Sequence, residues 1–228
     1  MGYDIVMFDA DGTLFDFGRA QEAAFYDAFA RKGFRIGSGV LGVYESINRE
    51  LWAKLERGEV TRQELLQARF RKLFDRFGID LDPAQFNRSY MESLSCAGFL
   101  IDGAFELLEA LEGRVRMIMV TNGSRKTQRG RVKQAGIERF FSDLIISEEI
   151  GFDKPDLRFF EKALAAAGGI PKGRVLVVGD SVSADITGAN NAGIPCCWYN
   201  PGGLPAPENL IIDHQIRAHR ELIPIVLS

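Results

Sequence analysis

The stretch that decides the fold is IVMFDADGTLFDF, residues 5–17. Four apolar residues lead directly into two aspartates, Asp9 and Asp11, which stand two positions apart. A short, continuously apolar run of this kind is typical of a strand that is buried on both faces. Side chains two residues apart on a strand point the same way, so both carboxylates are expected to address one point. Gly12 then lets the chain turn sharply, and we expect Thr13 to tie that turn.

Short apolar runs alternate with amphipathic segments over most of the chain. Six runs are expected to be strands: residues 3–9, 115–123, 141–149, 173–181, 194–200 and, as a short last strand, 209–216. Four segments are expected to be helices: residues 103–113, 126–137, 156–169 and 182–193. Strands that alternate with helices predict a parallel sheet with right-handed crossovers. The expected fold class is therefore α/β, with a Rossmann-like core.

One region, between residue 17 and residue 97, contains no convincing strand. Its expected helices are residues 18–34, 42–60, 61–79 and 82–95. Thr61 followed by Glu64 predicts a capping box, and Asp82 before Pro83 predicts a second helix start. We therefore expect a core made of residues 1–16 and 98–228, with an all-helical domain of residues 17–97 inserted after the first strand.

Length and composition are those of an ordinary globular protein. The 228 residues suffice for one core with a smaller insertion, and 46% of them are hydrophobic. The net charge of −3 gives no basic field, so we expect no nucleic acid polymer as partner. No apolar run reaches the roughly 18 residues of a membrane span. Three cysteines without a C-x-x-C pair, and a start without a signal-peptide pattern, predict a cytoplasmic protein that contacts no membrane.

Polar residues stand where four of the apolar runs end. In chain order they are Asp9 and Asp11, then Thr121, Asn122 and Gly123, then Lys154, and then Asp180 and Asp185. Open parallel sheets bind ligands beyond the carboxyl ends of their strands, so all four groups are expected at one edge. Each motif alone is weak, because Asp-Gly or Thr-Asn-Gly commonly marks only a turn. Four in succession form a much more specific constellation.

The residue types in this constellation suit phosphoryl chemistry. Several carboxylates in one crevice repel one another and favour a bound cation. Because no histidine lies in these motifs, the all-oxygen site suits Mg²⁺. Hydroxyl and N–H groups at residues 121–123 suit phosphate oxygens, and Lys154 supplies a fixed positive charge. One carboxylate can attack phosphorus while the second donates a proton to the leaving oxygen.

The motifs DADGT, VTNGS, DKPD and GDSVSAD occur in the order that is typical of the haloacid dehalogenase (HAD) superfamily. The chain resembles the phosphatase branch of that superfamily. The resemblance implies that Asp9 is the nucleophile that becomes an aspartyl phosphate and that Asp11 is the general acid/base. It also implies that Thr121 and the Asn122 amide bind the phosphoryl oxygens, with Lys154 steadying the nucleophile and the phosphate.

The same resemblance implies a metal site and a cap. Mg²⁺ would be held by Asp9, by the backbone carbonyl of Asp11, by Asp180 and by Asp185, the last directly or through water. Residues 17–97 would form the helical C1 cap of the family, which closes over the site and expels water.

Residues 45–70, ESINRELWAKLERGEVTRQELLQARF, resemble the cap of the YjjG/YfnB-type pyrimidine 5′-nucleotidases. The resemblance implies a nucleoside monophosphate as substrate. Asn48, Trp52 and Arg69 are the candidate substrate contacts in this segment. For Trp52 the alternative is packing within the helical core, and for Asn48 and Arg69 it is a place on a helix surface. We expect a monomer or a weak homodimer.

Other functions stay open at this point. Dehalogenases of the superfamily lack the second aspartate, because halide leaves without a proton, so Asp11 argues for phosphoryl transfer. A phosphomutase, a phosphatase for sugar phosphates or phosphoglycolate, and a HAD-fold binding protein without catalysis are the alternatives. The basic tract TNGSRKTQRGR, residues 121–131, is interpreted as a solvated helix face.

Overall fold

The computed structural model describes residues 2–37 and 39–228. By their internal contacts, the residues divide into two compact units, Met1–Phe17 with Gly98–Ser228 and Gly18–Ala97. We call them the core unit and the helical unit and describe each by itself.

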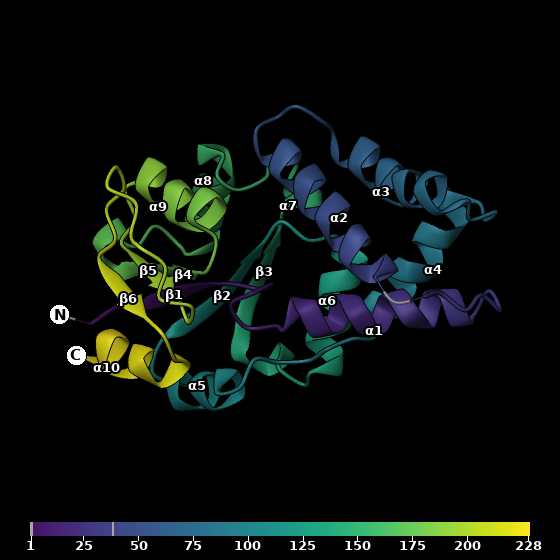
Figure 1. The fold of residues 1–228 in the computed structure, drawn as a ribbon. Helices are drawn as coiled ribbons and strands as arrows, with labels where there is room; N and C mark the ends of the chain where they lie inside the picture. Colours follow the sequence, from purple (N-terminus) through teal and green to yellow (C-terminus); the bar gives the residue numbers. More distant parts are fainter. Residues whose placement is uncertain (1, 38) are drawn as a thin grey trace. The chain divides into compact units, whose positions relative to one another are not determined.

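The core unit is built on a six-stranded sheet in which all strands are parallel (Figure 1). The strands are β1 (Ile5–Asp9), β2 (Arg116–Thr121), β3 (Phe141–Ile146), β4 (Val175–Gly179), β5 (Cys196–Tyr199) and β6 (His214–Ile216). Their order is β3-β2-β1-β4-β5-β6, so the chain builds outward from β1 in one direction and then in the other. The expected α/β, Rossmann-like fold is confirmed. The carboxyl end of β1 is the topological switch point, where such sheets bind ligands.

Helices cover both faces of this sheet. They are α5 (Ala104–Leu111), α6 (Arg125–Gln134), α7 (Ser147–Ile150), α8 (Leu157–Ala166), η3 (Val182–Ile186), α9 (Thr187–Ala192) and α10 (Leu222–Leu227). Figure 1 shows α5 and α10 on one side of the sheet and α8 and α9 on the other. On β1, Val6 and Phe8 pack into the first layer, and Ile5 and Met7 pack into the second. All four side chains are fully buried, which explains why the run is continuously apolar.

Several details of the core unit differ from the expected elements, among them β6, which covers only His214–Ile216 of the expected 209–216. Strand β3 ends at Ile146, and the following residues form the short helix α7. Residues 182–193 are not one helix, because a single π-helical turn, η3, precedes α9. Helix α10 was not expected, since its sequence LIPIVL contains a proline and β-branched residues that disfavour helices. Buried Leu222 and Val226 lie four residues apart and hold it against the sheet layer.

The helical unit contains most of α1 (Phe17–Ala30) and all of α2 (Val40–Glu56), α3 (Arg62–Phe77) and α4 (Pro83–Ser95). Both predicted helix starts are confirmed. Thr61 and Glu64 form the capping box at α3, and the Asp82 side chain accepts hydrogen bonds from the first backbone N–H groups of α4. The unit has its own aromatic core. Its members pack in stacked, edge-on and tilted pairs: Phe25, Phe29, Tyr44, Phe70, Phe74, Phe86 and Tyr90.

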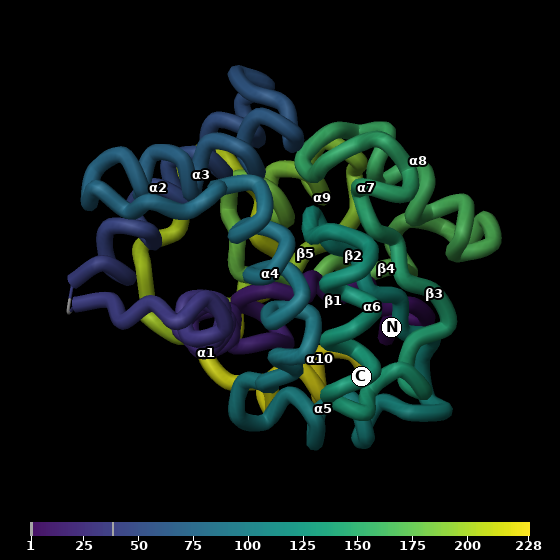
Figure 2. The backbone as a smooth tube through the Cα atoms, turned by 90° about the vertical axis from the view of Figure 1, so that its right-hand side faces the viewer, coloured from purple at the N-terminus to yellow at the C-terminus, as the bar shows by residue number. Residues whose placement is uncertain are grey.

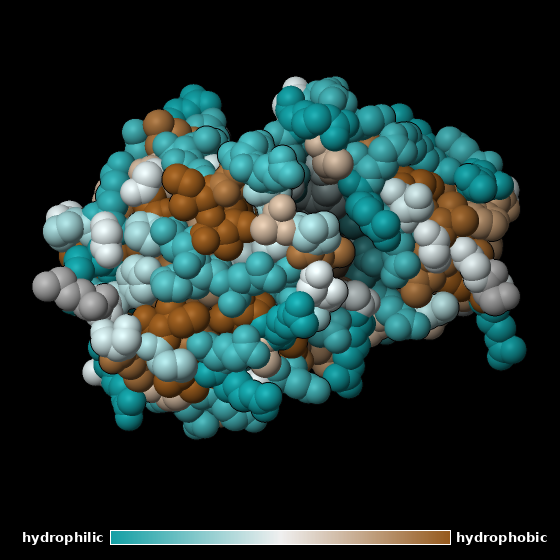
Figure 3. Space-filling view, turned by 60° about the vertical axis from the view of Figure 1, so that its left-hand side comes forward, coloured by the Kyte–Doolittle hydropathy of each residue, from teal (hydrophilic) through white to brown (hydrophobic). Residues whose placement is uncertain are grey.

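Residues close to the two ends of the chain lie side by side in the core unit, as Figures 1 and 2 show. The backbone N–H of Tyr3 donates to the carbonyl of Val226 at 3.1 Å, so α10 is tied to the start of the chain. On the face that Figure 3 shows, polar side chains surround separate apolar patches. Within residues 2–37 and 39–228, no helix is both long enough and apolar enough to cross a membrane.

Candidate active site

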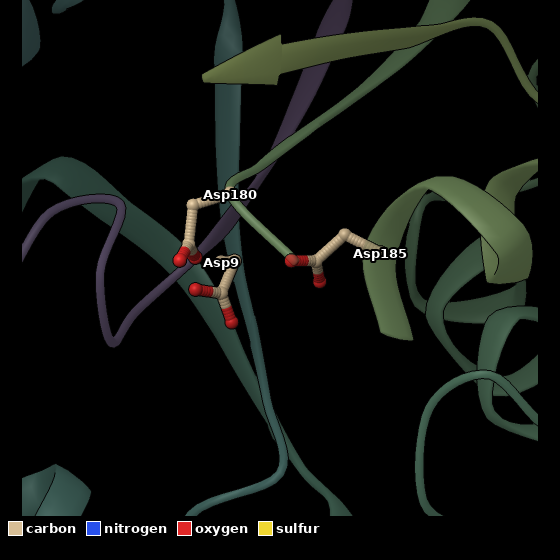
Figure 4. A group of neighbouring side chains, drawn as sticks. All are labelled: Asp9, Asp180 and Asp185. Carbon is tan, nitrogen blue, oxygen red and sulfur yellow. The ribbon is translucent and has the colours of Figure 1, made fainter. Parts of the chain in front are cut away.

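Three carboxylates converge at the carboxyl ends of β1 and β4 (Figure 4). Asp9 is the last residue of β1, Asp180 follows β4 directly, and Asp185 lies on the π-helical turn η3. Each offers an oxygen, and these oxygens all lie within 4.8 Å of one another. Asp9 and Asp185 are buried, and Asp180 is partly buried. The neighbouring strands β1 and β4 bring two of these residues together, and η3 turns the third toward them.

Lys154 lies against this carboxylate cluster. Its side chain is 2% exposed, and its Nζ donates to Asp9 Oδ1 at 2.6 Å and to Asp185 Oδ1 at 2.7 Å. The backbone around Lys154 is held by the side chain of Asn122: Lys154 N donates to Asn122 Oδ1 at 2.8 Å, and Asn122 Nδ2 donates to Lys154 O at 2.9 Å. The loop that carries the lysine is therefore fixed to the end of β2.

One ammonium group does not balance three carboxylates, and the pKa values show it. Burial, together with the negative charge of Asp185, raises the pKa of Asp9 well above its ordinary value, although Lys154 opposes this. Burial and the Asp185 charge also raise the pKa of Asp180 to about 7. For Lys154, burial opposes the charged form, but the two neighbouring carboxylates outweigh it and raise the pKa of the ammonium group. A further positive charge would stabilise the ionised carboxylates of the cluster.

The donor set fits Mg²⁺. It consists of carboxylate oxygens only, and its three negative charges exceed the single positive charge of Lys154. It lies at the carboxyl ends of the parallel strands. Mg²⁺ prefers one or two carboxylates together with water and substrate oxygens, whereas a zinc site would call for histidine or cysteine. Asp9, Asp180 and Asp185 are the residues that would hold it.

Thr121, the last residue of β2, is prepared to donate a hydrogen bond. Its Oγ1 accepts from the backbone N–H of Gly123 at 3.0 Å and from Gln128 Nε2 at 3.0 Å. A hydroxyl oxygen has two acceptor positions and one proton. Because two donors already point at the oxygen, the proton of Thr121 is directed toward a further acceptor, as the binding of a phosphoryl oxygen requires.

The carboxylate of Asp11 lies apart from the cluster of Asp9, Asp180 and Asp185. Its Oδ2 accepts from Gln128 Nε2 at 2.6 Å, and its Oδ1 forms an ion pair with Arg131. The side chain is 30% exposed, so it is accessible from solvent. The expectation that Asp9 and Asp11 point the same way along one strand does not apply, because β1 ends at Asp9 and Asp11 lies beyond it, in an isolated bridge to Phe15.

The turn after Asp11 is held differently from the expectation. Gly12 adopts φ +87°, in the left-handed region that favours glycine, and a methyl group there would overlap the Asp180 carboxylate. Thr13 does not tie its own turn through its side chain. Its Oγ1 donates to Asp180 Oδ1 at 3.1 Å and accepts from Asp180 N at 3.0 Å, so it joins the end of β1 to the end of β4.

Gln128 and Arg131 are the site residues that the sequence interpretation missed. The basic tract is not a uniformly solvated face, because Thr127, Gln128 and Arg131 are buried. One signal was available. A helix that packs on a sheet needs a buried face, and residues 126–137 offer few apolar side chains for one. Polar residues at a spacing of three, such as Gln128 and Arg131, must then face inward.

In the helical unit, Asn48 and Arg69 are each 3% exposed, so neither lies on a helix surface. Arg69 donates to Asn87 Oδ1 through Nε at 2.9 Å and through Nη2 at 2.6 Å, and its Nη1 lies 3.5 Å from Asn48 Oδ1. Asn48 in turn donates to Gln21 Oε1 at 3.2 Å. Trp52 is half-buried, with the guanidinium of Arg62 5.6 Å from its ring centroid.

Comparison with known proteins adds three findings. The model of the haloacid dehalogenase-like hydrolases matches residues 3–193. The chain is 34% identical to the pyrimidine 5′-nucleotidase PynA of Streptococcus pneumoniae, over 98% of this chain and 94% of the relative. It is 31% identical to the pyrimidine 5′-nucleotidase YjjG of Escherichia coli, over 97% of each chain. The crystal structure of the HAD-hydrolase YfnB of Bacillus subtilis bound to magnesium superimposes with a TM-score of 0.94 at 33% identity, over all of both chains.

Proposed function

Because this chain belongs to the haloacid dehalogenase-like hydrolases, we propose that it is a Mg²⁺-dependent phosphomonoester hydrolase that acts through an aspartyl phosphate on Asp9. The observation that carries the proposal is the position of Asp9, at the end of the central strand, between Lys154 and the carboxylates of Asp180 and Asp185. A single carboxylate that is held by a lysine inside an acidic cluster suits nucleophilic attack on phosphorus.

In the proposed first step, an oxygen of Asp9 attacks phosphorus and the bond from phosphorus to the ester oxygen breaks. Asp11 donates a proton to that leaving oxygen, so the product leaves as an alcohol. In the second step, water attacks the phosphorus of the aspartyl phosphate, Asp11 takes a proton from this water, and Asp9 is released as a carboxylate. Both half-reactions balance without any oxidant or further reactant.

The neighbouring residues bind and stabilise the phosphoryl group in this scheme. The Thr121 hydroxyl and the backbone N–H of Asn122 would donate to its oxygens, and Lys154 would offset its developing charge. Mg²⁺, held by Asp9, Asp180 and Asp185 with the Asp11 backbone carbonyl, would supply positive charge that neutralises the crevice and the phosphate oxygens. The core unit and the helical unit would then be the catalytic domain and the cap.

A pyrimidine nucleoside monophosphate is the proposed substrate. Two relatives that match almost the whole chain are named pyrimidine 5′-nucleotidases, which supports this choice. Asn48, Trp52 and Arg69 are the proposed substrate contacts of the cap. Trp52 is the first to test, because it is half-buried, whereas Asn48 and Arg69 are buried in a network that also orders the helices. The protein would act in the cytoplasm as a monomer or weak homodimer.

The experiment is a phosphate-release assay with Mg²⁺ on a panel of phosphorylated metabolites and p-nitrophenyl phosphate. The proposal predicts release by the wild type, a preference for UMP or dUMP, and loss of at least 10²-fold in Asp9→Asn. Equal activity of Asp9→Asn and wild type would refute the mechanism. A strong preference for sugar phosphates or phosphoglycolate would leave the mechanism intact and refute the nucleotidase assignment.

The cap contribution has a separate assay. Trp52→Ala should raise KM for UMP more than KM for p-nitrophenyl phosphate, since the smaller ester lacks the nucleoside. An equal rise in both would mean that Trp52 only packs the helices.

A further inference from the structure

The carboxylate of Asp11 is held by two residues of α6 that lie one helical turn apart. Gln128 donates to one oxygen at 2.6 Å, and Arg131 forms an ion pair with the other. Arg131 Nη1 also donates to Gln128 Oε1 at 3.4 Å, so the three side chains form a closed triangle. Each Asp11 oxygen therefore has its own donor, and the orientation of the carboxylate is defined by α6.

Arg131 is itself firmly placed. It is fully buried, and its guanidinium lies over the ring of Phe15 at 4.3 Å and near the ring of Phe17 at 6.0 Å from the centroids. Both aromatic residues belong to the segment that leaves the nucleophile strand, four and six residues after Asp11. A buried guanidinium is costly unless it is paired and hydrogen-bonded, so the ion pair with Asp11 is part of what makes this burial tolerable.

Gln128 joins Asp11 to the phosphate-binding end of β2. Its Nε2 has two hydrogens, and it lies 2.6 Å from Asp11 Oδ2 and 3.0 Å from Thr121 Oγ1. The Gln128 amide packs closely against the backbone of Gly123, where a methyl group would overlap the Gln128 side chain. One side chain thus bonds the expected acid/base carboxylate and the hydroxyl expected to bind phosphate.

We propose that Gln128 and Arg131 are positioning residues for Asp11: they set its carboxylate at a fixed place relative to Thr121, so that the proton reaches the leaving oxygen of the phosphate bound there. The inference rests on the proposed phosphatase function and deepens it. Neither residue touches the reacting atoms, and both act through Asp11.

A series of substituted phenyl phosphates tests this directly. These esters share the phenyl phosphate framework, but their leaving groups differ in how much they need a proton. With Asp11 well placed, kcat/KM should depend weakly on the leaving group. Asp11→Asn should show a steep dependence, with a loss of about 10²- to 10⁴-fold for phenyl phosphate and a much smaller loss for p-nitrophenyl phosphate.

Arg131→Met and Gln128→Met should each move the dependence toward that of Asp11→Asn, with about a 10- to 100-fold loss for phenyl phosphate. Arg131→Lys, which keeps the charge, should recover part of it. Arg129→Met is the matched control, because Arg129 is an exposed residue of the same helix that pairs with Glu149. It should keep the wild-type dependence. In the double variant Asp11→Asn/Arg131→Met, kcat/KM should be less than about twofold lower than in Asp11→Asn alone, because the arginine acts through Asp11.

A readout independent of turnover separates positioning from general damage. Beryllofluoride binding with Mg²⁺, followed by fluorine NMR, should be unchanged in Arg131→Met, since the phosphoryl site at Asp9 is intact. A wild-type leaving-group dependence in both Met variants, or losses that multiply in the double variant, would overturn the inference. If the wild type released no phosphate from any ester, or if Asp9→Asn were fully active, the proposed function itself would fail.

Discussion

The sharpest stability prediction concerns Asp180 in the protein without metal. Its pKa is raised from 3.8 to about 7 by burial and by the charge of Asp185. A pKa that is raised on folding means that the folded protein binds this proton more tightly than the unfolded chain does. The corresponding stability is therefore fully present below pH 3.8 and is lost as the pH rises through about 7.

The size of the effect follows from the same two values. The rise of the Asp180 pKa from 3.8 to about 7 means that folding disfavours the ionised form of Asp180, relative to the protonated form, by roughly 4 kcal/mol. Asp180→Asn stays neutral at every pH and keeps an oxygen that can accept from Thr13. In EDTA at pH 8.5, this variant should be more stable than the wild type by up to roughly 4 kcal/mol, and the gain should shrink toward pH 4.

The assay is urea unfolding in EDTA between pH 4 and pH 8.5, followed by circular dichroism. Taking the difference in the free energy of unfolding between variant and wild type at each pH cancels the contribution of carboxylates that both proteins share. Asp80→Asn, which makes the same charge change at an exposed position, is the control and should show no such pH dependence. Added Mg²⁺ should stabilise the wild type more than Asp180→Asn, which lacks a ligand. A pH-independent difference, or an Asp180→Asn protein that is less stable at pH 8.5 in EDTA, would show that the Asp180 charge does not destabilise the metal-free fold.

Three further substitutions test the local geometry. In urea unfolding, Gly12→Ala should lower the free energy of unfolding by about 1 kcal/mol or more beyond the loss in Gly113→Ala. Both glycines have positive φ, but only a methyl group at residue 12 would overlap a side chain, that of Asp180. Equal losses in the two variants would contradict this. Lys154→Gln should lower kcat by about 10²- to 10³-fold in the phosphate assay, and near-normal turnover would remove the lysine from the mechanism. Arg69→Met should lower the free energy of unfolding by about 1–3 kcal/mol, since it removes a donor from the amide oxygens of half-buried Asn87 and buried Asn48. An unchanged midpoint would show that the network contributes nothing.

The strands of the core unit, and the meeting of the carboxylates at their ends, could be predicted from the sequence because each signal is local. The run Ile5–Phe8 is apolar at every position, which is typical of a short strand with two covered faces, and Asp9 follows at its end. The parallel arrangement then places Asp180 beside Asp9. These inferences need no knowledge of how distant side chains pack.

The residues that escaped prediction are those whose environment is set by tertiary packing. Gln128 and Arg131 read as a polar helix face, and only the packing of α6 shows that they turn inward to Asp11. Helix α10 escaped because its proline and β-branched residues disfavour helices, and the packing of its buried face overrides that preference. The sequence predicts that Thr13 ties the turn beside it, whereas its side-chain partner, Asp180, is 167 residues away in the chain.

The most direct test of the account is chemical trapping of phosphate on Asp9. The enzyme would be mixed with Mg²⁺ and a phosphate ester, quenched during turnover, reduced with borohydride and analysed by peptide mass spectrometry. An aspartyl phosphate on Asp9 predicts homoserine at position 9, and no such product without ester or in Asp9→Asn. Steady phosphate release with an unmodified Asp9, or reduction at a different aspartate, would contradict the account.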